Sequence, residues 1–173
     1  MEIFLQKFSL RTVNGKAPGR IFRNGELYAL TWDDVDFENR RIRVSKSYNK
    51  RSRETKTTKA GYWRNIPIND DLMKLLRDLQ SKRKNNFVLP RLRDWAHGYQ
   101  AKVLRTYCTY LNITPIRFHD LRACFATQLL QNSVPPATVM KICGWKDLDT
   151  MARYIRVAGI DEVGATNKLS FVL

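Results

Sequence analysis

The residues best suited to chemistry lie in one stretch, 117–156. It opens with His119 and Arg122, three positions apart, and closes with Tyr154 among basic residues. Trp145 lies nine positions before that tyrosine. A guanidinium offers a planar fork that suits phosphate, and imidazole is the side chain that titrates nearest neutrality. If Tyr154 lies near this anion site, the set can carry out covalent phosphoryl transfer.

Helices are expected to position these side chains. Apolar residues at helical spacing predict an amphipathic helix with His119 and Arg122 on one face, offset from the apolar stripe. That stripe consists of Phe118, Leu121, Phe125 and Leu129. Pro135 and Pro136 suit the first turn of a second helix, which Gly144 would end. Asp147 or Asp149 would cap a third helix that bears Tyr154.

Earlier in the chain, Leu27, Tyr28 and Leu30 predict a short helix with Arg23 at or near its start, where anions are favoured. The acidic residues Asp33, Asp34 and Asp36 follow it, and we assign them to turns rather than to a metal site. Asn69 is expected to cap a helix with a leucine stripe, and another helix should run from about 98 to 111. His97 is expected to be a surface or packing residue.

Residues 40–68 alternate apolar and polar side chains, which predicts a twisted antiparallel unit. Ten basic residues and one acid, Glu54, lie between Arg40 and Arg64. Such a density of positive charge favours contact with a phosphate backbone. The basic residues are Arg40, Arg41, Arg43, Lys46, Lys50, Arg51, Arg53, Lys56, Lys59 and Arg64.

The composition limits the function classes. The 173 residues carry 31 Lys plus Arg against 16 acidic residues, a net charge of +15, which indicates a polyanion binder. No apolar run is long enough to cross a membrane. The three cysteines, Cys108, Cys124 and Cys143, are expected to be reduced core residues. With two histidines and no cysteine pair at ligand spacing, neither a zinc site nor another metal site is expected.

Three segments together resemble the tyrosine recombinases, or phage-type integrases. Arg23-x-Gly-Glu-Leu-x-Ala-Leu-x-Trp is similar to the family's first arginine box, and His119-Asp-Leu-Arg122 to its His-x-x-Arg box. Gly144-Trp145 to Tyr154 resembles its third box and nucleophile. Each box alone is weak evidence, but their order and spacing make the joint signal strong. The resemblance implies a mainly α catalytic domain with a small antiparallel β-sheet of three strands (α+β).

The resemblance also implies roles at a scissile DNA phosphate. Arg23 and Arg122 would clamp its nonbridging oxygens, while His119 would assist proton transfer. Trp145 would donate its indole N–H, at a position where the family often has histidine. Tyr154 would form a 3′-phosphotyrosine link. Lys59 would protonate the leaving 5′ oxygen, and Lys56 competes with it for that role. Neither a cofactor nor a metal is expected, because arginines supply the positive charge.

The segment before Arg23 departs from the family pattern, in which a hydrophobic helix precedes that arginine. Arg20 is therefore a second, weaker candidate. We expect a single catalytic domain over 1–173, in which about 1–22 is an atypical N-terminal segment. The family's separate N-terminal DNA-clamp domain is expected to be absent. About 159–173 is expected to form a C-terminal tail that docks between subunits.

The expected activity is cutting and rejoining of double-stranded DNA at a specific site, for integration or excision of a phage or mobile element. The expected assembly is a tetramer on recombination sites, in the bacterial cytoplasm at the nucleoid and without a membrane partner. Two alternatives remain open at this point. One is a type IB topoisomerase that relaxes supercoils, and the other is a DNA-binding regulator that keeps the fold without cutting, because 135–156 also suits a helix-turn-helix.

Overall fold

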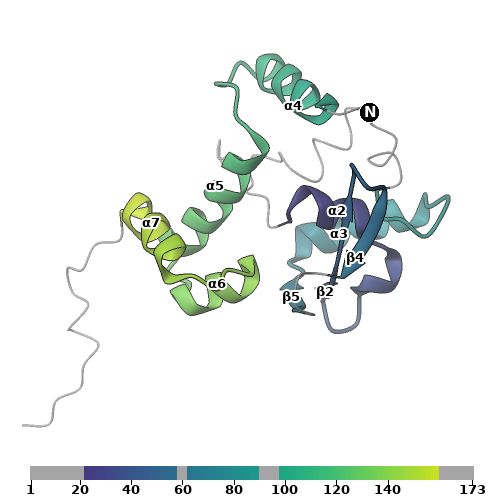
Figure 1. Ribbon diagram of the computed structural model, residues 1–173, viewed down its shortest axis with the longest axis horizontal. Helices are drawn as coiled ribbons and strands as arrows, with labels where there is room; N and C mark the ends of the chain where they lie inside the picture. The colour runs from purple at the N-terminus through teal and green to yellow at the C-terminus, as the bar shows by residue number, and fades with distance from the viewer. Residues whose placement is uncertain (1–21, 58–61, 90–97, 160–173) are drawn as a thin grey trace, which may run out of the picture.

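The structure, a computed structural model, describes residues 22–57, 62–89 and 98–159. Its N-terminal part combines short strands with two helices, and its C-terminal part is helical throughout (Figure 1). Along the chain the elements are α2 (Asn24–Ala29), η1 (Trp32–Asp34), β1 (Val35–Asp36), β2 (Arg41–Val44), β3 (Lys46–Asn49), β4 (Glu54–Thr57), β5 (Arg64–Pro67), α3 (Asp70–Ser81), α4 (Tyr99–Tyr110), α5 (Phe118–Gln131), α6 (Pro136–Cys143) and α7 (Leu148–Ala158). The expected class, mainly α with a small antiparallel sheet, is confirmed.

The N-terminal part contains a three-stranded antiparallel sheet in the order β1-β2-β5. Ile42 pairs with both Val35 and Ile66, and all three side chains are buried. Successive strand residues point to opposite faces, so Arg41 and Arg43 lie on the exposed face of β2. The same alternation turns Arg64 inward beside Ile66, which becomes important at the candidate site.

The strands β3 and β4 form a separate two-stranded hairpin, so residues 40–68 make two sheets rather than one unit. Lys46 pairs with Thr57 and Asn49 with Glu54. All four residues of β4 are exposed, whereas β3 is half-buried against α2. The hairpin therefore projects one strand and its turn, 50–53, away from the core.

The predicted helix caps are present. The side-chain oxygen of Asn69 accepts a hydrogen bond from the backbone N–H of Leu72 at 3.0 Å, which starts α3. The carboxylate of Asp147, not that of Asp149, accepts from the backbone at the start of α7. Gly144 ends α6 in the left-handed conformation, with φ +66°, as expected of a glycine cap.

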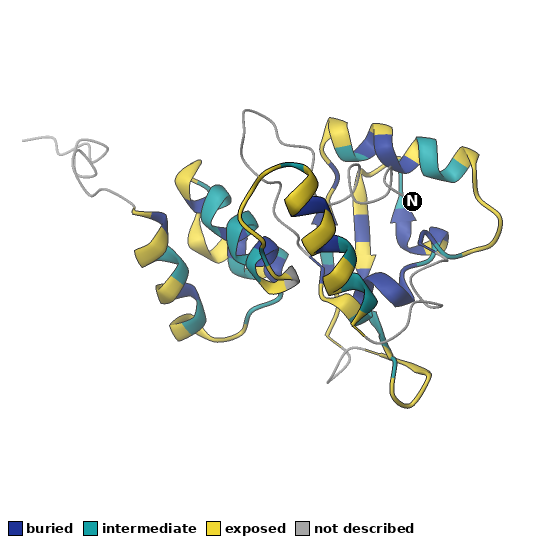
Figure 2. Ribbon diagram, turned by 90° about the horizontal axis from the view of Figure 1, so that it is seen from above, coloured by how far each residue is buried: buried dark blue, intermediate teal, exposed yellow. Residues whose placement is uncertain are grey.

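Buried residues form separate clusters in the two parts. In Figure 2 the dark blue of buried residues gathers on the strands and helices of the N-terminal part, while the C-terminal helices show broad exposed sides. Met151 on α7 packs with Ala126 and Leu130 on α5 and with Val139 on α6. Leu121 instead joins a small cluster with α4. The two parts meet where α6 contacts β5.

No helix within the described ranges combines the length and the apolar character needed to cross a membrane. The cysteines are free thiols, and Cys108 and Cys143 are buried, in line with the expectation, whereas Cys124 is half-buried.

Candidate active site

Arg122 lies on the buried face of α5. Ala126 and Leu130, one and two turns further along, are buried on the same side, so the expectation that Arg122 is offset from the apolar stripe was wrong. Its guanidinium donates a hydrogen bond to the carbonyl of Cys143, the last residue of α6. Burial lowers the pKa of Arg122, and the positive charges of Arg23 and Arg64 lower it further. Interactions with Cys143 and Glu26 raise this pKa but do not cancel the decrease. An arginine nevertheless stays charged at neutral pH, so this site holds a fixed positive charge.

Arg23 occupies the N-cap position of α2, as the sequence predicts. Its backbone N–H donates to the carboxylate of Glu26 at 2.7 Å, and its guanidinium donates to the same carboxylate at 3.3 Å. The Arg23 side chain is 57% exposed. Glu26 therefore orients Arg23 while leaving it accessible.

Arg64 pairs with Glu26 in the interior. Its two terminal nitrogens donate to the two carboxylate oxygens at 2.9 and 2.8 Å, and the two side chains are 3% and 2% exposed. Burial raises the pKa of Glu26, but hydrogen bonds and charge from Arg64 and Arg23 outweigh it, so the pKa lies below its usual value. Arg64 does not lie at the protein surface, which corrects its assignment to the phosphate-facing basic residues.

The Arg64–Glu26 pair is not among the sequence predictions, although the sequence contains a signal for the burial of Arg64. Arg64 stands two positions before Ile66 and four before Ile68, and both isoleucines are buried. In a strand these positions share one face, so the alternation alone predicts an inward-pointing arginine. A buried arginine needs a buried acid, but the sequence does not identify Glu26, 38 positions earlier, as that acid.

Trp145 and Tyr154 stack on one another across the turn that joins α6 and α7. Their ring centroids are 4.5 Å apart and their planes differ by 10°. The guanidinium carbon of Arg122 lies 5.6 Å from the centroid of the Trp145 ring. The indole thus contacts both the guanidinium and the phenol, and it brings three of the six predicted site residues together.

The remaining predicted site residues are exposed or fall outside the described ranges. His119 is exposed near the start of α5, so the two members of the His-x-x-Arg pair differ in burial. Lys59, Arg20 and His97 fall outside the described residues. Lys56 is exposed on β4 and forms an ion pair with Glu54 at 3.2 Å. Asp120, one position after His119, pairs with Arg117, and the hydrogen bonds from that residue lower the pKa of the Asp120 carboxyl.

The basic segment 40–64 is more neutralised than its sequence indicates. Acids pair with five of its ten basic side chains, and Arg51 and Arg53 stay exposed at the hairpin turn. The surface charge of the described part of this segment is therefore carried largely by the turn and by Arg43, which is exposed on β2. The acid pairs are Arg40–Asp70, Arg41–Asp36, Lys46–Asp34, Lys56–Glu54 and Arg64–Glu26.

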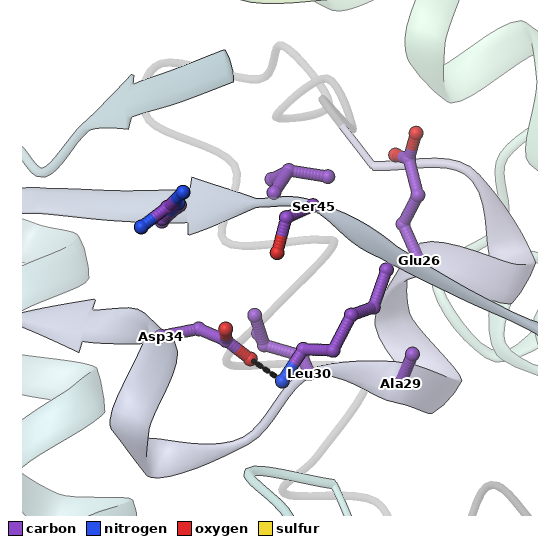
Figure 3. Close-up of a pocket in the computed structure, with 8 residues that line it drawn as sticks. Glu26, Ala29, Leu30, Asp34 and Ser45 are labelled. Carbon is purple, nitrogen blue, oxygen red and sulfur yellow. Dashed lines mark ion pairs between the residues drawn. The ribbon is translucent and has the colours of Figure 1, made fainter. Parts of the chain in front are cut away.

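A shallow depression between α2 and the β2–β3 connection is lined by both Glu26 and Asp34 (Figure 3). Asp34 pairs there with Lys46 at 2.9 Å and also accepts from Thr31. The side chain of Glu26 points away from Asp34 (Figure 3), and its carboxylate accepts from Arg64. Asp34 thus stabilises the connection between α2 and β1, which agrees with its assignment to a turn. None of the described residues groups three or more His, Cys, Asp or Glu side chains in a metal-binding arrangement.

Comparisons with known proteins agree with this architecture. Residues 7–159 match the phage integrase family. A tyrosine recombinase XerC-like protein from Caldanaerobacter subterraneus subsp. tengcongensis is 27% identical over 183 positions, covering 88% of this chain and 46% of that protein. The chain therefore spans about half the length of this curated relative.

Three solved structures are similar in fold. The Tn1549 transposon integrase in complex with transposon right end DNA has a TM-score of 0.68 at 21% identity, over 87% of this chain and 54% of that one. The XerA recombinase has a TM-score of 0.64 at 18% identity, over 88% and 56%. The catalytic domain of bacteriophage HP1 integrase has a TM-score of 0.54 at 19% identity, over 87% and 76%.

The arrangement of α5, α6 and α7 around Arg122, Trp145 and Tyr154 and the match over most of the chain lead to one assignment. The chain belongs to the phage integrase family, the tyrosine recombinases, an enzyme class that cuts and rejoins DNA.

Proposed function

We propose that this chain is the catalytic part of a site-specific DNA recombinase that works through a covalent 3′-phosphotyrosine intermediate. The observation that carries the proposal is the contact series Arg122–Trp145–Tyr154, in which one side chain separates a potential nucleophile from a buried, fixed positive charge. Membership of the family supports it. The DNA-bound transposon integrase among its structural relatives suggests duplex DNA as the substrate and a mobile element as the context.

In the proposed reaction the Tyr154 hydroxyl attacks a backbone phosphorus. A bond forms between the phenolic oxygen and phosphorus, and the bond from phosphorus to the 5′ oxygen breaks. Negative charge that develops on the nonbridging oxygens is stabilised by the guanidiniums of Arg23 and Arg122 and by the indole N–H of Trp145. Positioned charges of this kind act most strongly where water is excluded.

Two protons must move in this step. His119 accepts the phenolic proton, because a protonated phenol is a weak nucleophile. Lys59, or Lys56 in its place, gives a proton to the leaving 5′ oxygen. The phosphotyrosine ester keeps the energy of the broken bond, so a second 5′ hydroxyl can attack it, release Tyr154 and restore a phosphodiester. No nucleotide cofactor or metal takes part in this sequence.

The proposed assembly is a tetramer on the recombination site, joined through the C-terminal tail beyond Gly159. Its support is the family membership and the apolar residues at the end of the sequence, Leu169 and 171–173. Removal of residues 160–173 should reduce assembly on DNA more than DNA affinity, measured by light scattering and by titration. Equal assembly by the truncated and the intact chain would contradict this part of the proposal.

Covalent trapping tests the reaction itself. The intact chain is incubated, without added metal, with a pool of nicked duplexes of random flanking sequence, and complexes that survive denaturation are isolated. The nick lets a short cleaved fragment diffuse away, so the adduct accumulates. An adduct that disappears in Tyr154→Phe while DNA binding persists is the expected result. Binding without any adduct would indicate the DNA-binding regulator instead.

A further inference from the structure

The C-terminal end of α6 is held from two sides by buried arginines. The last four carbonyls of a helix have no partner within it. In α6, the first two of these carbonyls, those of Met140 and Lys141, accept from the backbone N–H groups of Trp145 and Gly144 at 3.0 and 3.3 Å. The other two have no such backbone partner in the turn, and arginine side chains from β5 and α5 fill that role.

Arg64 supplies the first of these side-chain contacts. Its Nε donates to the carbonyl of Ile142 at 2.9 Å, while its other two nitrogens donate to Glu26. Arg122 supplies the second contact, in which its guanidinium donates to the carbonyl of Cys143. The cations also suit the negative end of the helix. Arg64 therefore connects three elements: β5, which carries it, α2 through Glu26, and the end of α6.

Gly144 shows how closely Arg64 packs against the turn. A methyl group added at Gly144 would lie 3.0 Å from Cδ of Arg64 and 3.2 Å from one of its terminal nitrogens. Trp145 follows directly, and its neighbour Lys146 lies 5.0 Å from the ring centroid of Tyr62, just before β5. The turn that carries Trp145 is thus seated on the segment that carries Arg64.

We propose that Arg64 is a positioning residue for strand cleavage, an inference that rests on the proposed function. Arg64 touches neither DNA nor the reacting atoms. Through Glu26 it fixes Arg23, and through the end of α6 it fixes the turn that presents Trp145 and the carbonyl that holds Arg122. One buried side chain thereby sets the spacing between the two arginine-bearing segments. In such a site a displacement of about 1 Å slows the reaction on the order of 100-fold.

The test variant is Arg64→Lys, which keeps the charge but carries all its donors on one nitrogen and loses the fork. Arg40→Lys is the matched control. Arg40 also donates its Nε to a carbonyl, that of Ile68, and a terminal nitrogen to an acid, Asp70, but its side chain is 48% exposed and these partners lie where β5 connects to α3. Both variants replace with lysine an arginine that donates to one carbonyl and one carboxylate.

The first readout needs no activity. Hydrogen exchange is followed by mass spectrometry in intact wild-type and variant chains. Arg64→Lys should speed exchange in peptides that cover 23–27 and 143–146 and leave the α3 peptide, 70–81, unchanged. Arg40→Lys should leave the first two peptides unchanged. Equal exchange at 143–146 in wild type and Arg64→Lys would overturn the proposed connection, whether or not the chain cuts DNA.

The second readout is the single-turnover rate constant of adduct formation. We expect Arg64→Lys to lower it about 10- to 100-fold, with less than about a twofold change in DNA affinity and no change in its salt dependence, because no phosphate contact is lost. A rate constant, unlike an adduct yield, does not fall merely because part of the protein is unfolded. Arg40→Lys reports what the same Arg-to-Lys change does at a basic side chain of this segment outside the proposed connection, so the rate constant of Arg64→Lys should fall about 10-fold or more below that of Arg40→Lys.

A double-mutant cycle with Trp145→Phe completes the test. If Arg64 acts through the turn that carries Trp145, the two effects on the rate constant are not additive. Additive effects, or a salt dependence reduced as for a phosphate contact, would overturn the positioning role. Absence of any Tyr154-dependent adduct in the wild type would instead refute the proposed function, and the hydrogen-exchange result would still decide whether Arg64 holds the turn.

Discussion

Tyr154 stacks on Trp145 with the two rings nearly parallel and 4.5 Å apart, and the same indole lies against the guanidinium of Arg122. The two aromatic residues come from either side of the turn 144–147, which Gly144 opens in a left-handed conformation and Asp147 closes as a helix cap. The tyrosine is therefore positioned by this short turn and this ring contact together with the packing of its side chain against the cluster of α5, α6 and α7.

Two replacements of Trp145 should distinguish the contribution of its ring from that of its N–H group. Trp145→Ala removes the stacking surface of Tyr154, and we expect a loss of about 2–3 kcal/mol in unfolding free energy because the site is only half-buried. Trp145→Phe keeps a ring that can stack and should cost less. Urea unfolding and the adduct rate constant measure the two effects. Equal rate constants for the Phe and Ala variants would show that the stack contributes nothing to cleavage.

Acid should destabilise the fold through Glu26. The pKa of this carboxyl is lower in the folded chain than its usual value of 4.5, so the unfolded state binds the proton more tightly. Its contribution to stability is complete above pH 4.5 and is lost as the pH falls from there through the folded-state pKa. Unfolding free energy should therefore fall with pH in this range more steeply for the wild type than for Glu26→Gln.

The Gln variant should also be less stable at neutral pH by about 3 kcal/mol, because it leaves the buried Arg64 without its counter-charge. The other carboxyls with lowered pKa values, such as Asp36 and Asp70, are present in both proteins and cancel in the comparison. Parallel pH profiles would contradict the assignment to Glu26.

Two glycines provide a matched pair of helix-terminal substitutions. Gly144 and Gly159 end α6 and α7 with φ +66° and +59°, so alanine at either position costs about 1–2 kcal/mol in backbone strain. An added methyl group meets no atom of the described residues within 4 Å at Gly159, but at Gly144 it lies 3.0 Å from Arg64. Gly144→Ala should lower the urea midpoint further than Gly159→Ala, and equal midpoints would mean that Arg64 moves aside without cost.

The hairpin turn should account for more of the DNA affinity than the paired basic residues do. Arg51 and Arg53 are exposed at the turn, whereas Arg41 pairs with Asp36 at 3.1 Å. Each phosphate contact contributes about 0.9 to the slope of log affinity against log salt. Arg51→Ala and Arg53→Ala should each reduce this slope with a random-sequence duplex, and Arg41→Ala should reduce it less. Equal slopes for all three variants would contradict the paired-charge account.

Local features of the fold could be predicted from the sequence, and long-range pairs could not. The caps at Asn69, Gly144 and Asp147 follow from residue type and spacing within a few positions. The Arg64–Glu26 pair joins residues 38 positions apart, and no local pattern selects that acid among the 16 in the chain.

The candidate site, like the fold, could be predicted from the sequence only in part. Order along the chain predicted which residues to consider, and the structure brings Arg122, Trp145 and Tyr154 of that set into contact. That order did not predict that Arg122 lies on the buried face of α5 while His119 is exposed, because an i, i+3 spacing leaves the two side chains about 60° apart around the helix. The hairpin likewise looked uniformly basic because the acid that pairs with Lys46, Asp34, comes from another element.

The most direct test of the account is to identify the residue and the DNA end that are joined in the trapped adduct. The adduct is digested with trypsin and nuclease, and the peptide that retains a nucleotide is sequenced by mass spectrometry. We predict that the nucleotide is attached to Tyr154 through its 3′ phosphate. Attachment to another tyrosine, such as the exposed Tyr110, or through a 5′ phosphate would contradict the proposed mechanism.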